Sequence, residues 1–323
     1  MKMMKLGYLA SLVAIGAALG GAAQAAAPDS RELTVTLTRT PVKLISNVVF
    51  AQPSMRGYDN VALRMDVLKP TAAKPLPAVV FITGGGFVNA NKDSYIQQRL
   101  DLAQAGYVVA SIEYRVAPTA MFPAPLIDVK SAIRFLRANA ARFGIDAGHI
   151  GVLGESAGGY LSAFAGVSNG DRRFDQGEHL DQSSAVQAAV DLYGLSDLNR
   201  VGEGFSEAVQ AQHRSPSAPE AMWVNGPAVL GTGGAISSDP ARAEAANPVA
   251  YVSKTAAPFL LMHGDHDTLV SPRQTERLFV ALRGLGVDAT RYVVKGAAHG
   301  GEYWIQPPVM QTIIAFLDRH LKP

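Results

Sequence analysis

The sequence predicts an α/β fold, a mostly parallel central sheet flanked by helices, with a small inserted cap. Two observations predict this fold. Segments near the start of the domain alternate apolar and polar residues, whereas later ones are continuous apolar runs, a change typical of antiparallel edge strands followed by parallel strands covered on both faces. From there on, strand-like and helix-like segments alternate, which indicates βα units. One domain is expected over residues 31–323, since single α/β domains reach this size.

The expected strands begin with two alternating segments and continue with buried-type runs; they cover residues 33–38, 61–67, 77–82, 108–113, 149–153, 186–192, 258–262 and 290–294. The expected helices cover residues 95–105, 128–142, 160–166, 271–285 and 309–321. Their alternation favours a mostly parallel sheet.

Residues 195–247 interrupt this alternation, because they are polar, small and rich in glycine. We interpret them as an insertion over the sheet. Above the carboxyl ends of the strands, where open α/β sheets bind ligands, such a cap would shape a substrate pocket. The alternative is a plain surface excursion with its own small helix.

Residues 1–25 are predicted to be a secretory signal peptide. Lys2 and Lys5 precede an apolar stretch at 6–19, and Ala23-Gln-Ala25 satisfies the small-x-small cleavage rule, as does the Ala-Ala-Ala tripeptide that overlaps it. The apolar stretch is too short to span hydrocarbon comfortably, which disfavours a membrane anchor. The mature protein is therefore expected in the periplasm or the medium, with no stable membrane anchor.

Composition excludes several classes of partner. Without Lys2 and Lys5 the basic residues fall from 29 to 27 and equal the 27 acidic ones, so the mature protein is near neutral. A nucleic acid or an anionic membrane would need a basic surplus or patch, and none is visible. The chain also lacks cysteine, so it has no disulfide and no thiolate metal site.

The candidate nucleophile is Ser156. It stands in Gly154-Glu-Ser-Ala-Gly-Gly159, between the apolar run 150–153 and the small-residue helix 160–166, which is the strand, sharp turn and helix of a nucleophile elbow. Small residues two positions on either side prevent a clash between strand and helix. The alternative is a glycine-rich turn that merely packs.

A serine hydroxyl needs a base, and the base needs an acid to hold its tautomer. His299 is the candidate base, because the loop 295–301 directly follows the last predicted strand and precedes the last helix. The acid is expected in the loop after the preceding strand, where Asp265 and Asp267 both stand.

The candidate oxyanion hole is the segment Thr83-Gly-Gly-Gly-Phe87, which follows a buried strand. A glycine triplet lets backbone amides approach a substrate oxygen closely. We assign the amides of Gly85, Gly86 and Ala157 to this role. A dinucleotide-binding loop is excluded, since the triplet lacks the spaced G-x-G-x-x-G pattern.

From Val61 onward the chain resembles the α/β-hydrolase esterases and lipases, particularly the hormone-sensitive-lipase-like and bacterial feruloyl-esterase-like branches. The resemblance rests on the motifs above and on three further segments, 113–118, 122–129 and Asp191-Leu-Tyr-Gly194. In the esterase pattern, His-Gly is followed three positions later by the acid and three more on by valine. His263, Gly264, Asp267 and Val270 match it, so the resemblance selects Asp267, and Asp265 becomes a turn residue.

The chain departs from these families at Thr83, where they usually have histidine; a threonine hydroxyl can still brace the loop by hydrogen bonding. The resemblance implies hydrolysis of carboxylic esters through an acyl-enzyme, without metal or organic cofactor. The expected substrates are small-molecule or carbohydrate esters with short acyl groups, including acetyl or feruloyl groups on plant polysaccharide. Phe87, Glu155 and Trp223 are expected to contact the substrate.

Two other functions are weighed against esterase activity. A secreted serine peptidase of the prolyl-oligopeptidase-like type would have a propeller domain or an acidic helix that binds the amine, and neither is visible. A non-catalytic binding protein on a hydrolase fold is the second, because fold does not fix function. Relatives of that kind lose the triad, whereas this chain retains its three residues in order.

Overall fold

The computed structural model describes residues 30–229 and 231–323, and the chain divides into two units, residues 1–38 and 39–323. In the first unit, residues 30–38 have no regular secondary structure. The predicted strand at 33–38 is therefore wrong: Leu33, Val35 and Leu37 are 85%, 64% and 91% exposed, and an alternating pattern forms a strand only where one of its faces is buried. The predicted signal peptide at 1–25 lies outside the described residues.

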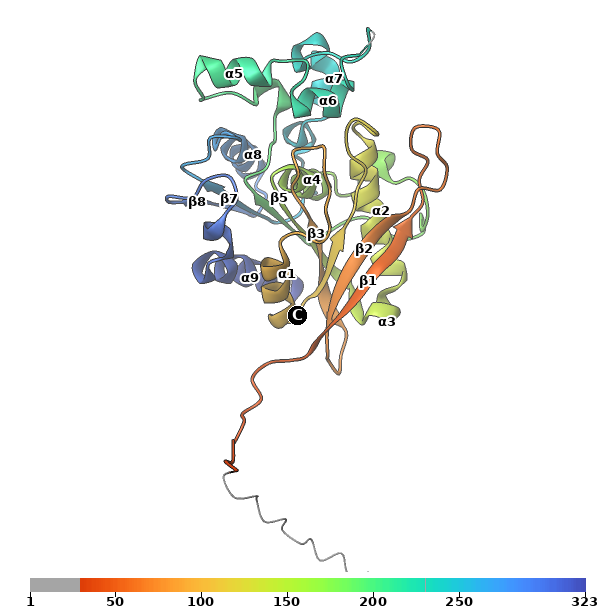
Figure 1. The fold of residues 1–323 in the computed structure, drawn as a ribbon, viewed down its shortest axis with the longest axis vertical. Helices are drawn as coiled ribbons and strands as arrows, with labels where there is room; N and C mark the ends of the chain where they lie inside the picture. Colours follow the sequence, from red (N-terminus) through yellow and green to blue (C-terminus); the bar gives the residue numbers. More distant parts are fainter. Residues whose placement is uncertain (1–29, 230) are drawn as a thin grey trace, which may run out of the picture. The chain divides into compact units, whose positions relative to one another are not determined.

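The second unit contains an eight-stranded sheet with the order β1-β2-β4-β3-β5-β6-β7-β8 (Figure 1). The strands are β1 (Val42–Ala51), β2 (Leu63–Pro70), β3 (Leu76–Ile82), β4 (Val108–Ile112), β5 (Ile145–Glu155), β6 (Ala188–Leu192), β7 (Phe259–Gly264) and β8 (Ala289–Val294). β2 pairs antiparallel with β1 and β4, and every other pair of neighbours is parallel. The prediction of a mostly parallel sheet with antiparallel strands at its start is confirmed.

Helices cover both faces of the sheet. α1 (Ile96–Gln104) and α9 (Pro307–Leu321) pack on one face, and α2 (Ala124–Ala138), α4 (Ala157–Val167) and α8 (Arg273–Gly284) pack on the other, each against its own apolar cluster. β3 serves both clusters, because Val79 and Phe81 face the first and Ala78, Val80 and Ile82 the second. This explains the continuous apolar run of β3, since a strand buried on both faces needs no polar alternation.

The helix expected at 128–142 is two helices, α2 and the short α3 (Ala140–Phe143), separated at Asn139. α2 also begins four residues earlier than expected. Pro125 stands in its first turn, where the missing N–H has no intrahelical partner to lose and the fixed φ suits a helix. Among the described residues, no helix is long and apolar enough to cross a membrane.

Residues 195–247 form three short helices, α5 (Glu207–His213), α6 (Pro219–Asn225) and α7 (Pro240–Ala245), which gather at one end of the sheet above α4 (Figure 1). They join β6 to β7.

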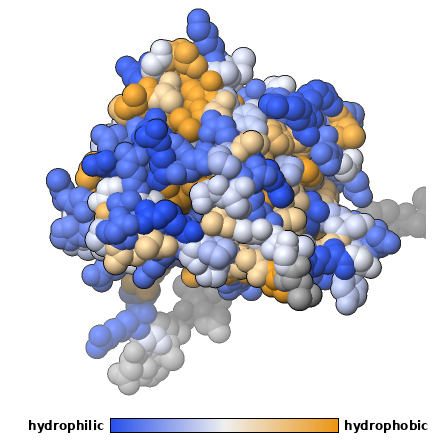
Figure 2. Space-filling model, turned by 90° about the horizontal axis from the view of Figure 1, so that it is seen from above, coloured by the Kyte–Doolittle hydropathy of each residue, from blue (hydrophilic) through white to orange (hydrophobic). Residues whose placement is uncertain are grey.

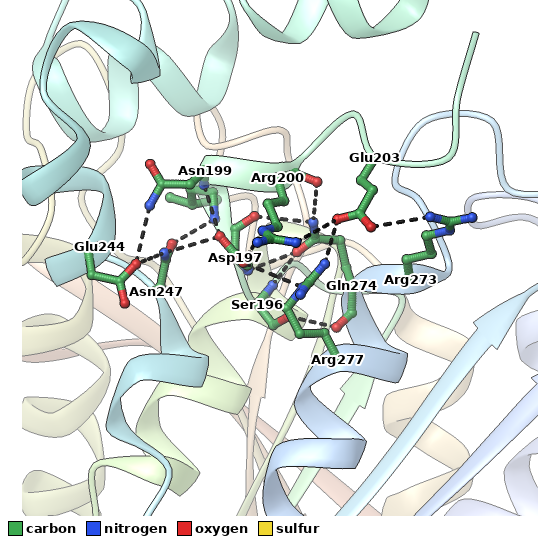
Figure 3. Close-up of polar contacts among 11 residues, drawn as sticks. Ser196, Asp197, Asn199, Arg200, Glu203, Glu244, Asn247, Arg273, Gln274 and Arg277 are labelled. Carbon is green, nitrogen blue, oxygen red and sulfur yellow. Dashed lines mark hydrogen bonds and ion pairs between the residues drawn. The ribbon is translucent and has the colours of Figure 1, made fainter.

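Hydrogen bonds of Gln274, a residue of α8, hold the start of this insertion against the helix (Figure 3). The Gln274 side chain accepts from the amides of Ser196 and Asp197 at 2.8 and 2.9 Å and donates to the carbonyls of Asp197 and Arg200 at 3.2 and 2.9 Å. The Ser196 hydroxyl donates to the Gln274 carbonyl at 2.6 Å. Because Gln274 is only 1% exposed, these bonds are shielded from water and fix the first turn of the insertion to the body of the fold.

The end of the insertion is tied to its start by Asn247, which is fully buried. Its side-chain oxygen accepts from the Leu198 amide at 2.6 Å, and its nitrogen donates to Asp197 at 3.3 Å and Glu244 at 3.0 Å (Figure 3). The first and last residues of the insertion are therefore joined in one hydrogen-bonded network next to α8.

Candidate active site

Ser156 lies in the sharp turn between β5 and α4, with φ 55° and ψ −119°. This conformation is strained for a residue with a side chain. The flanking glycines allow it: a Cβ on Gly154 would lie 2.1 Å from the Gly158 carbonyl oxygen, and a Cβ on Gly158 would lie 2.0 Å from that of Ile82. The turn thus has the geometry that the glycine spacing predicts for a nucleophile elbow.

The structure brings Ser156, His299 and Asp267 into one hydrogen-bonded chain. His299 Nε2 lies 2.8 Å from Ser156 Oγ, and His299 Nδ1 lies 2.7 Å from Asp267 Oδ2. They come from the turn after β5, the loop after β8 and the loop after β7, which meet because parallel strands end at the same edge. With its Nδ1 proton donated to the carboxylate, the ring keeps Nε2 free to accept the serine proton.

The Asp267 carboxylate is fully buried and saturated with donors. Oδ1 accepts from the amides of Leu269 and Val270, both at 2.9 Å, and Oδ2 accepts from His263 Nε2 at 3.1 Å as well as from His299. Burial alone would raise the pKa of Asp267, but the hydrogen bonds from His263 and His299 outweigh it and hold the pKa well below its usual range. Asp267 therefore stays ionised beside the base.

Asp265 is placed differently. It is exposed, accepts from the Gly296 amide at 2.7 Å and pairs with Lys295 at 3.1 Å. These contacts are those of a turn residue that binds local backbone, as expected for the carboxylate not selected as the acid.

The glycine loop after β3 lies against the elbow. A Cβ on Gly84 would be 3.2 Å from Ser156 Cβ, while Gly85 and Gly86 have φ 154° and 58°, values that side chains disfavour. The loop is closed by the amides of Val88 and Asn89, which donate to the Gly85 carbonyl. In the part of the chain that the structure describes, the amides of Gly85, Gly86 and Ala157 donate to no protein acceptor, which suits groups reserved for a substrate oxygen.

Thr83 does not brace this loop through its hydroxyl, contrary to expectation. The side chain is fully buried, and its hydroxyl has no partner among the described residues. The loop is held instead through the Thr83 carbonyl, which accepts from the Tyr114 hydroxyl at 2.8 Å. A phenol from the chain after β4 thus supplies the support expected of the threonine.

Comparison with known proteins fits this site and fold. Residues 65–282 match the BD-FAE family.

The chain belongs to the BD-FAE family.

It is 32% identical over 253 residues to the esterase LipC of Mycobacterium tuberculosis, a match over 75% of this chain and 58% of LipC. It is 30% identical to the esterase LipQ of the same organism, over 69% of this chain and 49% of LipQ. The chain therefore spans about half the length of these curated relatives.

Two solved structures resemble the whole domain. A truncated carbohydrate esterase from gut microbiota is 27% identical, with a TM-score of 0.74, and the match covers 89% of this chain and 99% of that one. The esterase Est2 of the planctomycete Thermogutta terrifontis, with butyrate bound, is 26% identical, with a TM-score of 0.66, over 88% of this chain and 96% of that one. The prediction of an α/β-hydrolase is confirmed.

In this BD-FAE protein, Phe87 and Trp223 form an aromatic cluster with Tyr160. The Phe87 ring centroid lies 4.6 Å from that of Trp223 and 5.4 Å from that of Tyr160. Phe87 is 3% exposed and Trp223 is fully buried. The insertion therefore packs its tryptophan, from α6, against Phe87 of the glycine loop that follows β3. The substrate contacts expected of Phe87 and Trp223 stay a prediction, and both side chains are almost entirely enclosed by protein.

Glu155 is also placed in the interior, at 1% exposure. Its carboxylate accepts a hydrogen bond from the Tyr193 hydroxyl. A substrate contact does not fit this position, because a side chain so enclosed presents no surface to a ligand. The sequence placed Glu155 beside the nucleophile, but the direction of its side chain depends on Tyr193, which lies 38 residues away.

Sequence reasoning missed two residues that support the site. His263 entered only as a marker of spacing, yet it bonds Asp267. Tyr193 entered only as part of a motif, yet its ring lies edge-on to the His299 ring, with centroids 4.8 Å apart. A signal was available in the sequence, because His263 lies at the carboxyl end of β7 and Tyr193 directly follows β6, at the edge of the sheet where the site residues gather.

Proposed function

We propose that this BD-FAE family protein is a serine carboxylesterase. The observation that carries the proposal is the continuous hydrogen-bonded chain from Ser156 through His299 to Asp267, next to a glycine loop whose Gly85 and Gly86 amides find no acceptor among the described residues. The esterase relatives and the carbohydrate esterase of similar structure support it.

The reaction follows from the contacts. Ser156 Oγ forms a bond to the acyl carbon while His299 Nε2 takes its proton, and the carbonyl oxygen becomes an oxyanion bound by the amides of Gly85, Gly86 and Ala157. When the ester C–O bond breaks, the imidazolium returns that proton to the leaving alkoxide. Water then attacks the acyl-enzyme by the same route, with His299 again as the base, and Asp267 stabilises the imidazolium in both halves.

We propose short acyl groups for the substrate. The space behind the glycine loop is filled by Phe87, Tyr160 and Trp223, and a long chain would need an open apolar trough, since each buried methylene contributes about 0.8 kcal/mol. The face seen from above carries hydrophilic residues over much of its area, with apolar residues in separate patches (Figure 2). The butyrate bound to the related Est2 is consistent with this size class, and a sugar hydroxyl as the alcohol is consistent with the carbohydrate esterase neighbour.

The test is a panel of aryl esters with acyl chains from about two to about twelve carbons, with acetylated xylan and methyl ferulate alongside. Hydrolysis of the short esters that disappears in Ser156→Ala supports the proposal. No hydrolysis of any ester by the folded wild-type protein would overturn it.

A further inference from the structure

Glu155 is a buried acid without a cation. It is 1% exposed, Tyr193 donates to Oε2, and Oε1 has no hydrogen-bond partner among the described residues. No salt bridge joins it to a lysine or arginine in that part of the chain. Burying a carboxyl group in this way is costly, because the interior neither solvates the charge nor pairs it. Such a cost is typical of a functional position.

The side chains of Tyr193 after β6 and of Tyr95 and Gln98 at the start of α1 lie near this carboxyl, and a positive charge on His299, after β8, acts on it electrostatically. Of these, Tyr193 connects Glu155 to the site, since its hydroxyl bonds the carboxylate while its ring lies edge-on to His299. The Tyr193 ring also packs on Trp304, with centroids 4.4 Å apart, which holds it in place.

Among these neighbours, His299 is the group that gains a positive charge. Gln98 is neutral, and burial raises the pKa of Tyr95 and Tyr193, so both phenols stay protonated. The charge on Glu155 is thus uncompensated while His299 is neutral and becomes compensated when His299 takes the Ser156 proton. An interaction that is stronger in the transition state than in the ground state accelerates the reaction.

We propose that Glu155 is a positioning residue that acts through His299: its buried carboxylate, held behind Tyr193, stabilises the imidazolium formed during proton transfer. The proposal rests on the proposed esterase function and adds a second anion to the one supplied by Asp267.

The proposal predicts a specific pH dependence. Burial raises the pKa of Glu155 to about 7, while the hydrogen bond from Tyr193 and the charge of His299 act to lower it. The carboxylate is therefore present above about pH 7 and lost as the pH falls through it. Because the pKa in the fold is raised above its usual value, ionised Glu155 also destabilises the fold, and this destabilisation is greatest above pH 7.

The experiment compares Glu155→Gln with Asp191→Asn. Glutamine keeps the shape and an acceptor for Tyr193 but removes the charge. Asp191 is the matched control, because it is fully buried, burial raises its pKa to about 7, and its carboxylate bonds the Gly194 amide instead of a group beside His299. In the Glu155→Gln variant, kcat for a short aryl ester at pH 8 falls roughly tenfold, and the acid limb of kcat/KM moves to lower pH by about half a unit. Asp191→Asn leaves both unchanged.

Thermal unfolding separates this role from a structural one. Glu155→Gln raises Tm at pH 8 by roughly 2 to 5 °C, since a buried charge is removed, and has little effect at pH 5, where Glu155 is already protonated. Loss of activity together with a lower Tm at pH 8 would mean that Glu155 only supports the fold, and would overturn the proposal. So would wild-type kcat and an unchanged acid limb in the Glu155→Gln variant.

Tyr193→Phe provides an independent arm. Without the phenol donor, the pKa of Glu155 rises further, so the activity lost at pH 7 is recovered by about pH 9. A loss that is equal at both pH values would contradict the proposal.

NMR titration of the His299 imidazole tests the coupling without turnover, with the signal assigned by comparison with His299→Ala. A midpoint that moves to lower pH in Glu155→Gln supports the coupling between Glu155 and His299. An unchanged midpoint overturns the proposal, even if ester hydrolysis itself is absent.

Discussion

His263 donates through Nε2 to the Asp267 carboxylate at 3.1 Å, although neither side chain has any exposure. The same nitrogen lies 3.0 Å from the Val270 carbonyl oxygen. Both partners are acceptors, so Nε2 carries the proton, and the other ring nitrogen lies 3.0 Å from the Thr275 hydroxyl on α8. The Asp267 carboxylate is thus hydrogen-bonded to two histidines, His299 and His263.

We expect His263→Leu to lower kcat by about tenfold or more and to destabilise the fold at pH 7, since a hydrogen bond to a buried charge contributes about 1.5–3 kcal/mol. The depressed pKa of Asp267 stabilises the fold above its usual pKa, and that stability is lost as the pH falls through the depressed value. The difference in free energy of unfolding between the wild type and His263→Leu, measured by urea unfolding, should therefore be largest at pH 7 and become smaller under strongly acid conditions. His263→Gln, whose amide nitrogen can reach Asp267, is the control; equal damage in both variants would contradict this role.

Asp267→Asn should lower kcat by roughly four orders of magnitude, because an amide lets His299 adopt the wrong tautomer. Asp265→Asn is the matched control, since that carboxylate bonds Gly296 and Lys295 on the surface. Steady-state kinetics with a short aryl ester, after circular dichroism shows both variants folded, check this. The assignment fails if Asp265→Asn is the more damaged variant.

Trp223→Phe should open room behind the glycine loop, because the indole packs on Phe87 and Tyr160. We expect the ratio of kcat/KM for a six-carbon acyl ester to that for an acetyl ester to rise several-fold, since each newly accommodated methylene contributes about 0.8 kcal/mol. Tyr251→Phe serves as the control, because the Tyr251 ring packs on Phe164, which in turn contacts Tyr160. An unchanged acyl profile in the Trp223 variant would remove this side chain from the acyl pocket.

Gln274→Leu should loosen the insertion without touching the triad. It removes the side-chain bonds to Ser196, Asp197 and Arg200 and leaves their buried polar groups unpaired, each at a cost of about 1–3 kcal/mol. Limited proteolysis should then cut within 196–247 faster than in the wild type. Arg273→Ala is the comparison, because its bond to Glu203 joins exposed or half-exposed side chains and contributes about 0–1 kcal/mol. Equal cleavage in the two variants would contradict the bracing role of Gln274.

Features coded by local patterns were predictable from the sequence. The elbow around Ser156 is one, because its strand, glycines and helix are contiguous, and the central strands are another, because burial on both faces leaves a continuous apolar run. The choice of Asp267 over Asp265 needed a known esterase pattern, since both residues share one loop.

Features that depend on distant segments were not predictable. The direction of Glu155 is set by Tyr193, and the position of Trp223 is set by Phe87, which lies in another part of the chain. The strand wrongly predicted at 33–38 also depended on distant segments. Its residues do alternate, but a strand needs a partner strand and a buried face, and the segment's own sequence does not show whether either is present.

The central claim is that Ser156 is a nucleophile activated by His299. The most direct measurement is mass spectrometry of the protein after reaction with an organophosphate, with hydrolysis of a short aryl ester followed in parallel. We expect one adduct on the peptide that carries Ser156, complete loss of hydrolysis, and neither adduct nor significant hydrolysis in Ser156→Ala, which should lose several orders of magnitude in kcat. An adduct on Ser162, or a Ser156→Ala variant that keeps more than about a tenth of wild-type turnover, would contradict the account.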